Sequence, residues 1–108
     1  MGEREGPLFS TRAEEPSLVE AIEDFVVGVA ERVDHLQDAE GEGDLRRVAR
    51  LARELATEAD AVGYELLGQV ARGVCMAAQA EKSEEVRDLL LALTATTHRV
   101  RLGHPGAF

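Results

Sequence analysis

The sequence contains no tryptophan, and aromatic residues make up only 4% of its 108 residues. Sheets draw heavily on aromatic and β-branched side chains, so this scarcity argues against an all-β core. Hydrophobic residues still account for 44% of the chain, and leucine, valine and alanine dominate them. The length is that of one domain. The composition therefore favours a single helical domain with an aliphatic core.

The sequence also offers no pair of cysteines for an internal disulfide and no segment that could span a membrane. Cys75 is the one cysteine, which excludes an internal disulfide and fits a reducing compartment. The N-terminus has no apolar stretch of the kind that forms a signal peptide. The longest aliphatic run, residues 89–93, is far shorter than the roughly 20 residues that span a bilayer. We expect a cytoplasmic protein without a membrane anchor.

Basic residues are scarce in the first half of the chain. The formal net charge is −9, and residues 14–44 hold eleven acids but a single base, Arg32. Such a surface repels the phosphates of nucleic acids and of anionic lipids, so neither is an expected partner. From Leu45 onward, bases slightly outnumber acids. The molecule is therefore expected to be acidic on its first long helix and locally basic where the second begins.

Apolar residues recur every three or four positions along four segments, which predicts four amphipathic helices. The first is expected to begin with a capping box of Ser17 and Glu20, and Gly28 marks a point where it could bend or break. Asp44 and Ser83 are the expected N-caps of the second and fourth helices. The expected inward positions are Leu18, Ile22, Phe25, Val29, Val33 and Leu36; Leu45, Val48, Ala52, Leu55, Ala59 and Val62; Leu67, Val70, Ala71, Val74 and Ala78; and Val86, Leu89 or Leu90, Leu93, Thr97 and Val100.

Short connections between long helices predict antiparallel neighbours. The expected fold class is all-α, an up-down antiparallel four-helix bundle, with room for an extra short N-terminal helix. We expect a flexible N-terminal arm over residues 1–15, the bundle over residues 16–102, and a C-terminal tail over residues 103–108.

The second helix carries a pattern of small and apolar residues that is more specific than amphipathicity alone. Ala52, Leu55, Ala59 and Gly63 stand in the register of the motif of histidine-containing phosphotransfer (HPt) domains, and residues 16–101 as a whole resemble that family. The resemblance implies a helical bundle that docks on the receiver domains of response regulators or on histidine kinases, in a bacterial two-component or phosphorelay pathway. We expect no cofactor and no metal.

The departures from the family pattern fall on its chemistry. The resemblance aligns Arg53 with the phosphoaccepting histidine, Ala56 with a lysine and Thr57 with a glycine. Phosphotransfer needs a nucleophilic imidazole nitrogen, whereas a guanidinium is always protonated and has no free lone pair. We therefore expect a non-catalytic, HPt-like module rather than an enzyme.

The candidate binding face is the exposed stripe of this second helix. Arg46, Arg50 and Arg53 are spaced to share one face, and Thr57 and Asp60 continue it. If the stripe is a docking face, its arginines would meet the carboxylates or the aspartyl phosphate of a receiver domain. The alternative interpretation is a solvated surface whose arginines form weak ion pairs with neighbouring acids.

Two other functions remain open. The bundle could be a structural or oligomerisation module that pairs through apolar helix faces and binds no receiver. Active phosphotransfer could also proceed through His35, His98 or His104, although none of them has the motif context of an acceptor. The three histidines also lack the spacing of a metal site.

Overall fold

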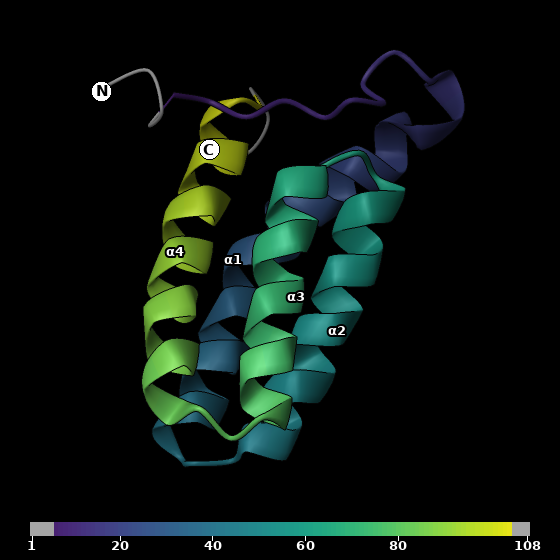
Figure 1. The fold of residues 1–108 in the computed structure, drawn as a ribbon. Coiled ribbons are helices and arrows are strands. Elements are labelled where there is room, and N and C mark those ends of the chain that lie inside the picture. Colours follow the sequence, from purple (N-terminus) through teal and green to yellow (C-terminus); the bar gives the residue numbers. More distant parts are fainter. Residues whose placement is uncertain (1–5, 105–108) are drawn as a thin grey trace.

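The computed structural model describes residues 6–104, and within this range it consists of four long helices and no strand. The helices are α1 (Val19–Gly41), α2 (Leu45–Ala61), α3 (Glu65–Gln79) and α4 (Ser83–Leu102), and a short 3-10 turn, Pro16–Leu18, leads into α1. Consecutive helices run in opposite directions and lie side by side (Figure 1). Helices α1 and α3 lie diagonally across the bundle. The expected all-α four-helix fold is confirmed.

The three connections between helices share one geometry. Each contains a residue with positive φ, namely Gly43 (75°), Gly63 (87°) and Glu81 (58°). The residue that follows donates its N–H to a carbonyl five residues back, which is the Schellman pattern. Because each turn reverses the chain within three residues, the up-down order follows directly. The bonds are Asp44 to Ala39 (2.9 Å), Tyr64 to Ala59 (2.8 Å) and Lys82 to Ala77 (3.0 Å).

The core is aliphatic, as the composition predicts. Each helix contributes one fully buried leucine, and the remaining core positions are filled mostly by valine and alanine. Phe25 and Tyr64 stack near one end of the bundle, with ring centroids 5.9 Å apart. Of the expected inward positions, Leu18, Leu45, Val70 and Leu89 are only partly buried and the others are buried. The four fully buried leucines are Leu36, Leu55, Leu67 and Leu93.

Two of the three expected N-caps are wrong. Ser17 lies within the 3-10 turn, and Leu18 takes the N-cap position of α1 without a side-chain bond. Ser83 is already the first residue of α4, because the Schellman turn makes Lys82 the N-cap. Asp44 is confirmed, since its carboxylate accepts the N–H of Arg47 at 3.1 Å. Helix α1 continues through Gly28 without a break.

The segment before α1 crosses one end of the bundle and is bonded to it. We call residues 6–12 the strap; in Figure 1 it is the purple segment that passes the end of α4 on its way to α1. Residues 1–5 of the expected arm and residues 105–108 of the expected tail lie outside the described range. Hydrogen bonds join the strap to the end of α4 and to the α2–α3 turn. They run from the N–H of Leu8 to Arg99 O (2.9 Å), from Arg99 Nε to Gly6 O (2.7 Å), from Ser10 Oγ to Val62 O (2.5 Å) and from the N–H of Thr11 to Gly63 O (2.9 Å).

Two glycines make room for the strap. Gly63 has a φ of 87°, and a Cβ on it would lie 2.5 Å from Ser10 Oγ and 2.8 Å from the backbone nitrogen of Arg12. A Cβ on Gly103 would overlap the carbonyl oxygen of Leu8. The strap can approach the end of the bundle this closely only because both positions lack a side chain.

Candidate protein-binding face

The five residues of the predicted stripe lie along one side of α2, as their spacing requires. Arg46, Arg50, Arg53 and Thr57 are exposed, and Asp60 is partly buried. The opposite side of α2 packs into the core through Val48, Ala52, Leu55 and Ala59. The guanidinium of Arg53 is therefore available to solvent halfway along the helix.

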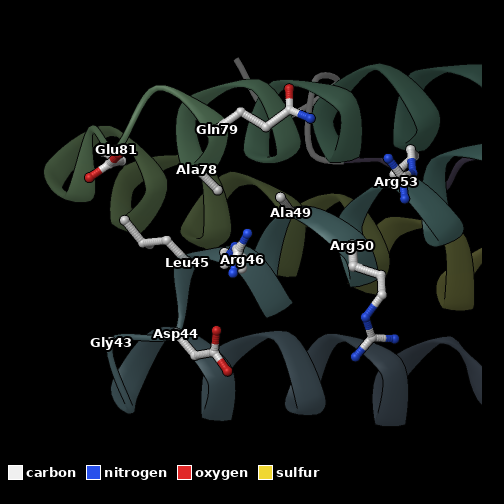
Figure 2. A pocket seen from close by; sticks show the side chains of 10 residues that line it. All are labelled: Gly43, Asp44, Leu45, Arg46, Ala49, Arg50, Arg53, Ala78, Gln79 and Glu81. Atoms are coloured by element: carbon white, nitrogen blue, oxygen red, sulfur yellow. The ribbon is translucent and has the colours of Figure 1, made fainter.

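The three arginines line an open groove between α2 and the end of α3. The groove has a volume of about 890 Å³, and Ala78, Gln79 and the turn residue Glu81 complete its α3 side. In Figure 2 the three arginine side chains stand along α2, and that of Arg50 extends away from the α3 residues. Neither Gln79 nor Glu81 is expected from the sequence, because their position depends on how α3 packs beside α2.

The charges on this side of α2 are only partly neutralised. Among residues 6–104, neither Arg46 nor Arg53 forms an ion pair or a side-chain hydrogen bond. Arg50 pairs with Glu54 one turn further along, at 3.7 Å, and such exposed pairs contribute only about 0.3–0.5 kcal/mol. Asp44 and Glu81 also line the groove, so its three arginines leave it with a small excess of positive charge that a bound anion could meet at little cost to existing contacts.

The last two residues of the stripe serve the fold. Thr57 Oγ1 donates to the carbonyl oxygen of Arg53 at 3.1 Å, within the helix. Asp60 forms an ion pair with Arg72 of α3. Its other carboxylate oxygen is buried against Gly68, where a Cβ would overlap it. Asp60 thus ties α2 to α3, and the arginines remain as the exposed charged part of the stripe.

The positions that the HPt resemblance singles out differ in exposure. Arg53 and Thr57 are exposed, whereas Ala56 is buried next to α3. A lysine at position 56 would therefore need the α2–α3 contact to open. The exposed group at position 53 has five N–H donors and no acceptor, which suits binding of a carboxylate or phosphate and not nucleophilic attack.

The other candidate residues do not converge on this face. His35 and His98 are exposed on α1 and α4, and His104 is partly buried just after α4. Cys75 is buried in α3. In the part of the chain that the structure describes, no cluster of three or more histidine, cysteine or acidic residues could hold a metal ion. None of the described helices is long and apolar enough to cross a membrane.

Comparison of the chain with protein-family models, with curated proteins and with solved structures found no match.

Proposed function

We propose that this chain is a non-catalytic, HPt-like docking module that acts in a bacterial two-component or phosphorelay pathway in the cytoplasm. Its partner is the receiver domain of a response regulator, or a histidine kinase, and the contact is made by the arginine groove of α2. The observation that carries the proposal is the exposed guanidinium of Arg53, which has no ion-pair partner among residues 6–104.

The chemistry of the groove supports an acidic partner. Arginine binds carboxylates and phosphoryl groups through paired N–H donors, and Arg46 and Arg53 need not give up an ion pair within residues 6–104 to do so. The acidic residues of the molecule are concentrated on α1, which holds seven of them and a single arginine. A partner with an acidic pocket is repelled by α1 and attracted by the groove, so the field of the protein favours one docking orientation.

Receiver binding tests the proposal directly. Titration calorimetry with purified receiver domains is expected to give at least one complex, and Arg53→Glu should weaken it by roughly tenfold or more, since loss of a charge-assisted contact is worth 1.4 kcal/mol or above. Arg12→Glu is the matched control, because it makes the same change of charge at an exposed arginine that forms no ion pair within residues 6–104 and lies on the strap, outside the groove. Equal affinity of wild type and Arg53→Glu would remove the groove from the interface.

The absence of catalysis is a separate claim with its own test. Incubation with a receiver domain that carries a labelled aspartyl phosphate is expected to leave the chain unlabelled, because position 53 supplies no free nitrogen lone pair. Acid-labile label on the wild-type chain would instead favour transfer through a histidine. Substitution of His35, His98 and His104 one at a time would then locate the acceptor.

A further inference from the structure

The outer face of α3 has almost no charge. Helix α3 contains only two charged residues, Glu65 and Arg72, and Arg72 is drawn towards α2 by its ion pair with Asp60. From Leu66 to Met76, the residues of α3 that are exposed or half-buried on the side away from the core recur at intervals of three and four, the spacing of a seam between paired helices. This seam consists of Leu66, Gln69, Gly73 and Met76.

The seam exposes large apolar side chains to solvent. Leu66 is 42% exposed and Met76 is 69% exposed. Phe9 of the strap, 66% exposed, lines a small cavity together with Leu66 and so extends the apolar surface at one end. The strap is bonded to the bundle at Leu8 and Thr11, on either side of Phe9. The aromatic ring is therefore carried on a backbone that is fixed at both sides.

We propose that this chain forms a two-fold symmetric dimer in which α3 packs antiparallel against α3 of a second copy. In a two-fold symmetric contact, the same surface of both copies meets, so that surface must be complementary to itself. The seam of α3 meets this requirement. When the helices cross between positions 70 and 72, Leu66 of each copy lies opposite Met76 of the other. Gly73, which is half-buried beside Leu89 of α4, then lies opposite Gln69 and adds no side chain to the contact. Phe9 covers the two ends of the contact.

The distribution of charge makes α3 the face through which two copies can pair with the least repulsion. Two copies that each carry a net charge of −9 repel one another over most of their surfaces. Helix α1, with its seven acids, lies diagonally across the bundle from α3. Pairing through α3 therefore places the two acidic helices on opposite outer sides of the dimer, at the greatest separation that the fold permits.

The dimer does not depend on the proposed function. The arginine groove lies on the side of α2, and the seam lies on the outer side of α3, so both can be occupied together. Arg53→Glu is accordingly expected to leave the dimer intact.

Analytical ultracentrifugation from low to high micromolar concentration tests the proposal. The wild-type chain is expected to shift from monomer to dimer, and Met76→Glu should raise the dissociation constant by roughly tenfold or more, because it buries a charge in the contact. Leu91→Glu is the matched control, since Leu91 of α4 is 67% exposed but lies outside the seam. Circular dichroism verifies that both variants fold.

Three results would overturn the proposal. They are a wild-type chain that stays monomeric throughout, a dimer that Met76→Glu leaves unchanged, and a dimer that Leu91→Glu weakens as strongly as Met76→Glu does.

Discussion

Tyr64 is the residue whose ionisation reports most directly on the packing at the α2–α3 turn. Its ring is buried against Phe25, and this burial raises the pKa of its phenol above the ordinary 10.0, while a hydrogen bond with the backbone of Ser10 acts in the opposite direction. The chain has one tyrosine and no tryptophan, so the ultraviolet absorbance of tyrosinate reports this residue alone. In a pH titration, the midpoint of the tyrosinate absorbance is expected above pH 10.0 for the folded chain and near pH 10.0 for the chain unfolded in denaturant.

The same shift predicts how stability changes with alkaline pH. Because the folded-state pKa is the higher one, the unfolded chain loses its phenolic proton first as the pH rises past 10.0. The free energy of unfolding should therefore fall between the unfolded-state and folded-state pKa values. Urea unfolding across this range should show the decline in wild type and a shallower one in Tyr64→Phe. Equal slopes in the two proteins would contradict the assignment.

Gly63 and Gly43 occupy equivalent positions in successive turns but differ in their surroundings. Both have positive φ, so alanine costs roughly 1–2 kcal/mol at either position. At Gly63 the new Cβ would also press against Ser10 and Arg12, whereas nothing lies within 4 Å of the equivalent atom at Gly43. Overpacking of this kind adds about 1–3 kcal/mol. Chemical denaturation should therefore show a distinctly larger loss of stability for Gly63→Ala than for Gly43→Ala. Similar losses in the two variants would show that the strap moves away from the new Cβ without a cost in free energy.

The stripe on α2 shows how far single residues can be predicted. The exposure of Arg53 follows from spacing alone, because Ala52, Leu55 and Ala59 fix which side of the helix faces the core. The role of Asp60 does not follow from spacing, although it lies on the same side. Its partner Arg72 belongs to another helix, and the contact depends on the absence of a side chain at Gly68.

At the scale of elements, the ends of the helices were the least predictable feature. Gly43 and Gly63 mark two turns in the sequence, but the third turn has positive φ at Glu81, which carries no such signal. That turn shifts the N-cap from Ser83 to Lys82. A serine next to two glutamates has the composition of a cap, yet the backbone geometry of the preceding turn decides which residue occupies the position.

The difference between a true cap and a false one is measurable. Asp44→Ala removes the acceptor of the Arg47 N–H and should lower the free energy of unfolding by about 1 kcal/mol. Ser83 is the first helical residue of α4 and its side chain forms no cap bond, so Ser83→Ala should change stability by less than about 0.5 kcal/mol. Thermal or urea unfolding of the two variants tests the assignment, and a larger loss for Ser83→Ala would reverse it.

At the scale of the whole molecule, the bundle was predictable and the strap was not. Four amphipathic periods and short connections leave few arrangements other than neighbouring antiparallel helices. The strap has no period, and its acceptors on Val62, Gly63 and Arg99 are main-chain oxygens far along the sequence. Backbone carbonyls at helix ends carry no signal in a sequence, so a segment rich in glycine, proline and charge suggests an unattached arm.

The strap should also be the part of the described molecule that opens most easily. Its bonds must offset the entropy of ordering a chain segment without helix or sheet, which costs about 1–2 kcal/mol per residue. The amides of Leu8 and Thr11, which donate to Arg99 and Gly63, are therefore expected to exchange with solvent sooner than amides of the buried part of α3.

Gly103→Ala sharpens this expectation, because its Cβ would overlap the carbonyl of Leu8 and force the strap away from the end of α4. Exchange at Leu8 and Thr11 should become faster still, while exchange in α2 and α3 stays nearly unchanged. Gly41→Ala is the matched control, since its Cβ would meet nothing within 4 Å. Faster exchange throughout the bundle in Gly103→Ala would show that the strap is an integral part of the core's stability and not a separately opening element.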